Sequence, residues 1–506
     1  MPEKISASLR AAIEATDRNH ADKKTFDTLV LLDDASTREY LDRLHEIDER
    51  DPDAFFDREA VLANIRRLAA CNNRDLLRFL ASGSDGPAPA PVRSYWINNA
   101  VQARLTRRMI DIVKRRWDVV RLELLDSPDA KAFLPAIASD AKSAGRCDID
   151  AAVPQNASRI GAEALWRRGI NGEGVIVAVV DTQVNRSHPD LADRMSPDPG
   201  GGAPHGDECA CDGNDLSADT YHGTLSAGLI AGDGKSGLKT GLAPGAMMMS
   251  VGIGLPETTA WCGYQHALLR GADVIAQSAS WAPDLKKNPH GFRPKYAAWR
   301  RACEIIMAAR VPHACSVKTS ADEARKRKSP LAIPFNIPAP ANAPPPWRHP
   351  AQILVGGRSS AMACGAADQD GRLIPESGMG PASWSERPFE DYPFDPPSKN
   401  GLIKPDVCSY ARGACSCSNQ FPEKEPAYLP HGGASAATSY LGGCLALLVS
   451  ACRSARRPVL PSRLQQALEA TAAPLVGQKR MKQDQYGAGL INVEAAYDYG
   501  RERRWW

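Results

Sequence analysis

The stretch Val175–Leu191, VIVAVVDTQVNRSHPDL, begins as an unbroken apolar run and ends as a polar, turn-forming segment. A continuous run of Val, Ile and Ala is typical of a strand buried on both faces, as in a parallel sheet. Asp181 ends this run, and in open α/β sheets sites form at the carboxyl ends of strands. An aspartate there is also common as a helix cap or turn residue, so Asp181 alone does not identify a site.

Similar apolar segments recur downstream and alternate with helical segments and glycine-rich turns. They are AMMMSVGI at 246–253, ADVIAQSAS at 272–280 and QILVGG at 352–357. Strands of this kind alternating with helices predict an α/β fold, a doubly wound and mostly parallel sheet with helices on both faces. We assign this domain to residues 159–506.

The N-terminal part of the chain has a different texture. Leu, Ala, Glu and Arg at helical spacing predict two amphipathic helices within 39–82, after a short strand at 28–32. The segment 92–126 has the pattern strand, helix, strand. We therefore expect a helical and small α+β region at 1–126 and a linker at 127–158. The proline-rich segment 329–350 predicts a long loop.

Composition excludes some partners. The 62 basic and 59 acidic side chains leave a net charge of +3, which gives no field for nucleic acid or an anionic membrane. No segment has the apolar length of a signal peptide or membrane span, and thirteen cysteines favour reduced thiols over a disulfide framework. We expect a cytoplasmic protein of two or three domains.

Two further blocks resemble the surroundings of Asp181, because each sets a reactive side chain among small residues. YHGTLSAGLIAG at 221–232 contains His222, and HGGASAATSYLGG at 431–443 contains Ser435. Each has a plain structural interpretation, since small residues at the start of a helix allow close packing. Together they give Asp, His and Ser in chain order, each on its own glycine-rich junction.

This order, with these surroundings, resembles the subtilisin-like serine proteases, or subtilases, and looks like a divergent bacterial branch of that family. The resemblance extends over about 160–500, where GLIKPDV and YGAGLINVEAA also match. It implies that Ser435 attacks a peptide carbonyl while His222 takes the proton and Asp181 orients the imidazole. The implied substrate is a peptide or protein.

The resemblance also assigns the groups around the triad. It implies an oxyanion hole made by the Ser435 backbone N–H and by Thr319, which stands where subtilases have an asparagine. Asn336 and Asn342 lie in the proline-rich block and receive no assignment. The segment Ser278-Ala279-Ser280 would bind an extended peptide by strand addition. Residues 92–126 are similar to the inhibitory propeptide of subtilases, which makes the N-terminal region an expected partner of the peptidase domain.

The chain departs from the family pattern at several positions whose backbone orients the triad side chains. They are Gln183, Ala434, Ser439 and the run Ser409-Tyr410-Ala411. With Thr319, these departures predict a serine endopeptidase of reduced activity. Two alternatives stay open: an impaired pseudoprotease that serves as a peptide-binding module, and a peptide ligase or macrocyclase that passes the acyl group to an amine.

A metal site has weak support in the sequence. His205, Asp207, Cys209 and Cys211 lie close together, and Cys415 and Cys417 form another pair. Neither pair has the Cys-x-x-Cys spacing of common zinc sites, so we expect no metal and no cofactor. Calcium stays open, because subtilases often bind it although no calcium loop is recognisable here.

Overall fold

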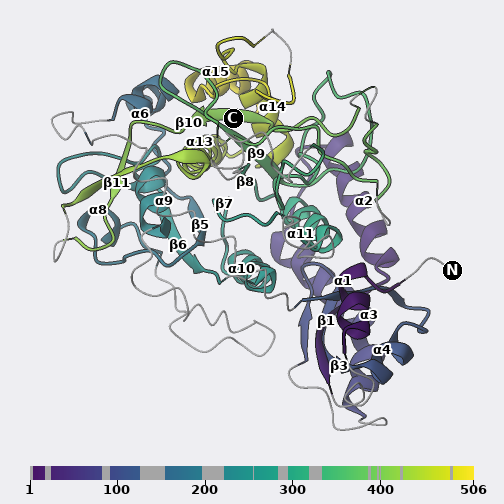
Figure 1. Cartoon of the computed structure of the whole chain (residues 1–506). Coiled ribbons are helices and arrows are strands. Elements are labelled where there is room, and N and C mark those ends of the chain that lie inside the picture. The colour runs from purple at the N-terminus through teal and green to yellow at the C-terminus, as the bar shows by residue number, and fades with distance from the viewer. Residues whose placement is uncertain are drawn as a thin grey trace.

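A parallel six-stranded sheet forms the centre of the larger domain (Figure 1). The computed structural model describes residues 4–16, 24–82, 92–125, 147, 154–196, 222–254, 256–282, 294–317, 333–375, 377–385, 389–395, 398, 400–421, 426–478 and 482–506. The strand order is β10-β9-β8-β7-β5-β6, and every neighbouring pair is parallel. The strands are β5 (Ile176–Asp181), β6 (Met247–Gly252), β7 (Val274–Gln277), β8 (His313–Ser316), β9 (Ala361–Ala367) and β10 (Val407–Tyr410).

Helices cover both faces of this sheet, because alternate residues of each strand point to opposite sides. Val177 and Val179 of β5 pack with α9 (His222–Ala231) and α13 (Gly433–Ser454). Ala178 and Val180 pack with α10 (Glu257–Leu269) and α11 (Tyr296–Ala308). The predicted α/β architecture is confirmed.

Helix α13 is the central helix of the domain. Among the described helices it alone is long and apolar enough to cross a membrane, but its apolar stretch is entirely buried in the protein. Two glycines in its middle allow close packing. A Cβ at Gly442 would lie 2.9 Å from Cβ of Ala276 in β7, and one at Gly443 would lie 2.8 Å from Cβ of Leu242 in the segment before β6. Burial in the core therefore accounts for the apolar character of α13.

Smaller elements complete the domain around this core. The two-stranded sheet of β11 (Ala414–Cys417) and β12 (Tyr428–His431) precedes α13. The other helices are α6 (Gln155–Ile160), α7 (Ala162–Arg167), α8 (Pro189–Ala192), α14 (Pro461–Ala470) and α15 (Val493–Glu502).

The N-terminal region folds around an antiparallel sheet of order β2-β3-β1-β4. Its strands are β1 (Thr25–Leu32), β2 (Arg93–Tyr95), β3 (Ala100–Thr106) and β4 (Val119–Leu124), and its helices are α1 (Ala7–Glu14), α2 (Ala35–Arg50), α3 (Arg58–Ala81) and α4 (Arg107–Val113). Helices α2 and α3 are the two predicted amphipathic helices. Met109, Ile110 and Val113 of α4 are buried against the sheet, as their spacing predicts.

This N-terminal region packs on the α10 and α11 side of the larger domain (Figure 1). Trp96 and Ile97 join the apolar cluster of α10 and α11, and the backbone N–H of Ile97 donates to the side chain of Gln265, 3.3 Å away. The guanidinium of Arg301 on α11 bonds Asp34 at the start of α2. The two regions therefore share one continuous apolar core.

Two features differ from expectation. The segment QILVGG at 352–357 is not a strand, and Ile353 and Val355 are exposed there. The strand is instead β9. Its sequence, AMACGAA, consists mostly of small residues and lacks the Val and Ile run that is typical of a buried strand. In addition, α6 begins at Gln155, before residue 159, and its Ala157 and Ile160 enter the core of the larger domain.

Candidate active site

The site lies where the order of the strands reverses. From β5 the chain passes through α9 to β6 on one side, and then through α10 to β7 on the other side of β5. The boundary between β5 and β7 is thus a topological switch point, where open α/β sheets bind their ligands. Asp181 ends β5 and Ser278 follows β7, so both lie at the carboxyl edge of the sheet at this point.

Asp181 and His222 form a close, buried pair. The Nδ1 atom of His222 lies 2.8 Å from each carboxylate oxygen of Asp181, and both side chains are almost fully buried. A carboxylate can only accept, so Nδ1 carries the hydrogen and Nε2 is left with its lone pair. The backbone N–H of Thr182 and the hydroxyl of Ser226 also donate to Asp181, at 2.7 and 3.3 Å.

The position of His222 depends on the glycine that follows it. A Cβ on Gly223 would lie 2.0 Å from the carbonyl oxygen of Thr182, so only glycine fits there. The N–H of Gly223 also donates to the Thr182 hydroxyl at 2.7 Å. Helix α9 therefore begins directly against the end of β5, which brings the imidazole to Asp181.

Ser435 lies in the first turn of α13, where the backbone N–H groups have no partner within the helix. Gly433 begins this turn with a φ of +71°, a left-handed conformation that favours glycine. The sequence suggested that the small residues here serve close helix packing, but at position 433 the backbone angle is what requires glycine. Ser435 is almost fully buried, and its carbonyl accepts from the hydroxyls of Ser439 at 3.0 Å and Ser278 at 3.4 Å.

The link between Ser435 and His222 is the loosest part of the arrangement. Both residues are described, and the structure shows no hydrogen bond between the Ser435 hydroxyl and the imidazole. Such contacts are often long in ligand-free enzymes and shorten when substrate binds. The arrangement thus has an oriented base and a serine at a helix N-terminus, and the hydrogen bond between them is not formed in this structure.

A second histidine at the site was not singled out from the sequence. The His431 ring packs edge-on against the His222 ring, with centroids 5.4 Å apart. His431 is buried at the end of β12, paired with Ala414 of β11, and lies four residues before Ser435. The only sequence sign was its place at the start of the HGGAS segment.

Of the other predicted site residues, the structure describes residues 278–280 but not Thr319. Ser278, Ala279 and Ser280 follow β7 directly, and Trp281 then pairs with Ala339 through two backbone hydrogen bonds of 2.8 and 2.9 Å. Thr319 lies outside the described residues, so its place relative to Ser435 stays a prediction.

The two asparagines of the proline-rich block are both described. The Asn336 side-chain oxygen accepts from the backbone N–H of Met379 at 2.8 Å. The Asn342 side-chain oxygen is buried and has no partner among the described residues.

The residues that gave weak support for a metal site in the sequence are only partly among the described residues. His205, Asp207, Cys209 and Cys211 lie outside the described residues. Cys417, from the second pair, lies with His188 and Asp190, and their ligand atoms are within 4.8 Å of one another.

These ligand atoms are largely occupied by the protein itself. His188 bonds the carbonyl of Ala427 through Nε2 and the N–H of Asp190 through Nδ1. The Asp190 carboxylate accepts from the Ser236 N–H and the Tyr428 hydroxyl, each at 2.7 Å. Burial raises the pKa of the Cys417 thiol, which disfavours the thiolate that a metal would bind. The cluster fits internal hydrogen bonding better than a metal.

Comparison with known proteins points to one family. The model of the subtilase family, peptidase S8, matches residues 172–489. A subtilisin-like protease of Arabidopsis thaliana is 25% identical over 68% of this chain. The major intracellular serine protease of Bacillus subtilis is 31% identical over 27% of the chain, and fervidolysin of Fervidobacterium pennivorans is 36% identical over 27%.

The matches cover limited parts of the relatives. They span 28%, 44% and 18% of the lengths of the Arabidopsis, Bacillus and Fervidobacterium proteins, respectively. Among solved structures, the prenylagaramide maturation protease PagA aligns with a TM-score of 0.45 and 18% identity, covering 67% of this chain and 98% of that one. The family match includes β5, α9 and α13, the elements that carry the three candidate residues.

Proposed function

Because the chain belongs to the subtilase family of serine proteases, we propose that it hydrolyses peptide bonds through Ser435, His222 and Asp181. The observation that carries this proposal is the His222–Asp181 pair, with both carboxylate oxygens 2.8 Å from Nδ1. This contact fixes the tautomer that leaves Nε2 free to take the serine proton.

In the proposed reaction the Ser435 hydroxyl oxygen attacks the peptide carbonyl as His222 Nε2 accepts its proton. The His222 imidazolium, stabilised by Asp181, then gives this proton to the leaving amine. An acyl-enzyme ester remains on Ser435, and water hydrolyses it by the same proton route in reverse. The N-terminus of α13 favours the negative charge that develops on the carbonyl oxygen.

The nucleophile can be tested directly with a fluorophosphonate probe. The wild-type protein should be labelled at one serine, and Ser435→Ala should abolish the label. Ser450→Ala is a matched control, since Ser450 lies on the same helix and bonds the carbonyl of Glu173, which precedes β5, whereas Asp181 ends that strand. A folded wild-type protein that stays unlabelled would contradict the proposal.

A second candidate function is a peptide-binding pseudoprotease. It is favoured by the absence of a hydrogen bond between the described Ser435 and His222 side chains. Peptide turnover that disappears in Ser435→Ala would exclude it. The ligase alternative is tested on the same reactions by mass spectrometry, because only acyl transfer to an amine leaves a joined product.

Thr319 is proposed as the second oxyanion donor. A threonine hydroxyl is shorter than the asparagine amide it would replace. Thr319→Asn should therefore raise the turnover number, by up to about a hundredfold if a missing donor limits the rate. An unchanged or lower rate would remove Thr319 from the oxyanion hole.

We also propose that the N-terminal region inhibits the peptidase domain and assists its folding. The packing of Trp96 and Ile97 against α10 and α11 supports this role. Addition of the purified region 1–125 to a form cleaved in the linker should lower its activity.

We also propose a cytoplasmic location, on the composition of the sequence, whose thirteen cysteines are typical of reduced thiols.

A further inference from the structure

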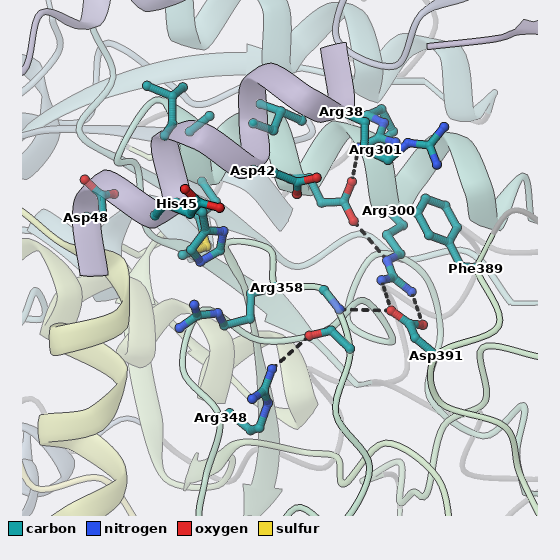
Figure 2. A pocket seen from close by; sticks show the side chains of 18 residues that line it. Arg38, Asp42, His45, Asp48, Arg300, Arg301, Arg348, Arg358, Phe389 and Asp391 are labelled. Atoms are coloured by element: carbon teal, nitrogen blue, oxygen red, sulfur yellow. Dashed lines mark hydrogen bonds and ion pairs between the residues drawn. The ribbon is translucent and has the colours of Figure 1, made fainter. Parts of the chain in front are cut away.

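A cavity of about 530 Å³ lies between the N-terminal region and the peptidase domain (Figure 2). Its walls are α2 on one side, and on the other α11 with the loops at 348–358 and 389–391. Asp181, His222 and Ser435 do not line it. The cavity is therefore a feature separate from the proposed active site.

One end of the cavity is a closed framework of matched charges. Arg300 forms two hydrogen bonds with Asp391 and one of 3.0 Å with Glu304, and its guanidinium stacks on Phe389 at 4.0 Å. Arg301 bonds the other oxygen of Glu304. Figure 2 shows this group on the side of the cavity away from His45. These side chains hold one another and leave little capacity for a ligand.

The other end has cationic and polar groups without matching acceptors. Arg348 donates one hydrogen bond, to the Gly356 carbonyl at 3.0 Å. Its Nε–H is buried and has no partner, and no carboxylate among the described residues lies within ion-pair distance of it. His45 lines the same end from α2, with Arg358 drawn between it and Arg348 (Figure 2), and its Nε2 is also buried without a partner. An unmatched buried donor is costly, so the Arg348 Nε–H favours an acceptor. In the tautomer that carries its hydrogen on Nε2, the neutral His45 ring can donate to the same acceptor.

The pKa of His45 also indicates an excess of positive charge at this end of the cavity. Burial, with the positive charges of Arg358 and Arg348, lowers the pKa of His45 to about 4. Arg358 has one carboxylate partner, Glu49 at the end of α2. Two guanidinium groups thus act on the imidazole, and of the two only Arg358 is bonded to a carboxylate.

The acidic residues of α2 do not offset this excess. Asp48 lines the cavity beside His45 and its charge acts on Arg358, but its carboxylate already bonds Arg310 at 3.1 Å (Figure 2). Glu46 is exposed and pairs with Arg50 at 3.7 Å. Asp42 is exposed as well, and its charge acts on Arg301 at the opposite end. An anion would therefore meet a locally positive wall.

We propose that this end of the cavity binds a small oxyanion, a carboxylate or a phosphate ester, between Arg348, Arg358 and His45. Planar guanidinium groups suit carboxylate and phosphate oxygens, because they offer parallel N–H donors. The rest of the cavity has room for the organic part of the ligand. Because His45 belongs to the N-terminal region and the arginines to the peptidase domain, the anion ties the two together.

The first experiment measures the thermal unfolding of the full chain in sodium phosphate, in sodium succinate and in sodium chloride at one ionic strength. A ligand that binds only the folded state raises the melting temperature. We expect phosphate, succinate or both to raise it by about 3 °C over chloride when the site is nearly saturated. The anion that acts distinguishes phosphate from carboxylate recognition.

Two variants make the site specific. Arg348→Gln should remove this rise and weaken binding at least tenfold by isothermal titration calorimetry. Arg372→Gln is the matched control, since Arg372 is an exposed arginine of the same domain, paired with Asp370, and should respond as the wild type does. His45→Gln tests the contribution of α2 independently and should weaken binding as well.

Two outcomes would overturn the proposal. One is a melting temperature that is equal in all three salts. The other is a rise of the same size in the wild type, Arg348→Gln and His45→Gln, which would place the anion elsewhere. Neither result bears on the proposed peptidase activity, because no step of the experiment measures turnover.

Discussion

The two faces of the six-stranded sheet are covered by helices of opposite character. On the α9 and α13 face, glycine and other small residues bring helix backbones close to the strands, as at Gly223 and Gly442. On the α10 and α11 face, large rings such as Trp261 and Trp299 pack edge to face at 5.7 Å, and beyond them lies the N-terminal region. Close backbone packing places reactive groups on one face, and bulky side chains hold a second region on the other.

This comparison predicts that substitutions on the first face change turnover while those on the second change stability. The largest effect is expected for Asp181→Asn, because an amide in place of the carboxylate favours the wrong imidazole tautomer. The turnover number should fall about 10,000-fold. Steady-state kinetics test this, with the melting temperature as the control. If activity falls only because less of the protein is folded, the substitution acts on stability, and the contrast between the two faces is wrong.

On the second face, Arg301→Met should destabilise the protein by about 3 kcal/mol. It removes a buried guanidinium and leaves the carboxylates of Asp34 and Glu304 without it. Urea unfolding measures the change, and the rate per folded molecule should stay the same. Arg50→Met, which breaks an exposed pair with Glu46, should cost less than about 0.5 kcal/mol. Equal costs would show that the buried pair does not hold the regions together.

The second face should also make stability depend on pH. His313, at the start of β8, is fully buried beside the ring of Tyr264, and burial lowers its pKa from 6.5 to about 3. The unfolded chain therefore binds a proton more readily below pH 6.5, and stability falls as pH decreases from there towards 3. Between pH 7.5 and 5 this residue should account for about 2 kcal/mol.

Replacing His313 by phenylalanine removes the titration while keeping a ring against Tyr264. Urea unfolding at pH 7.5 and 5 should then show a pH dependence about 2 kcal/mol smaller than in the wild type. If the variant and the wild type lose the same stability, the dependence arises at other groups.

The smallest effect is expected for Ser226→Ala on the first face. The Ser226 hydroxyl donates a long hydrogen bond of 3.3 Å to Asp181, one of several that orient the carboxylate. Its loss should lower the turnover number about fivefold, in line with about 1 kcal/mol for one such bond. A loss comparable to that of Asp181→Asn would mean that Ser226 fixes the carboxylate by itself.

The first face was largely predictable from the sequence and the second was not. Asp181, His222 and Ser435 stand in segments whose small residues reflect strict local geometry, such as the contact of Gly223 with Thr182. These constraints are visible within a dozen residues. The reversal of strand order that brings β5 beside β7 agrees with the doubly wound sheet that the alternating strands and helices of the sequence predicted.

Long-range side-chain contacts leave no comparable trace in one sequence. Arg301 and Asp34 are 267 residues apart, and Arg358 and Glu49 are 309 apart. Nothing in the local pattern around His45 indicates that the charges of two arginines from a distant loop act on it. Apolar runs can also mislead, because Ile353 and Val355 read as a strand and lie exposed in a loop.

The burial of α13 has a consequence for when the active site comes into being. All twenty residues from Gly433 to Cys452 are buried, so this helix cannot open locally without loss of the core. Backbone amides in such elements exchange with solvent only when the whole domain unfolds. The amides of α13 should be among the last to exchange, and Ser435 therefore acquires its setting in the same cooperative step that forms the domain.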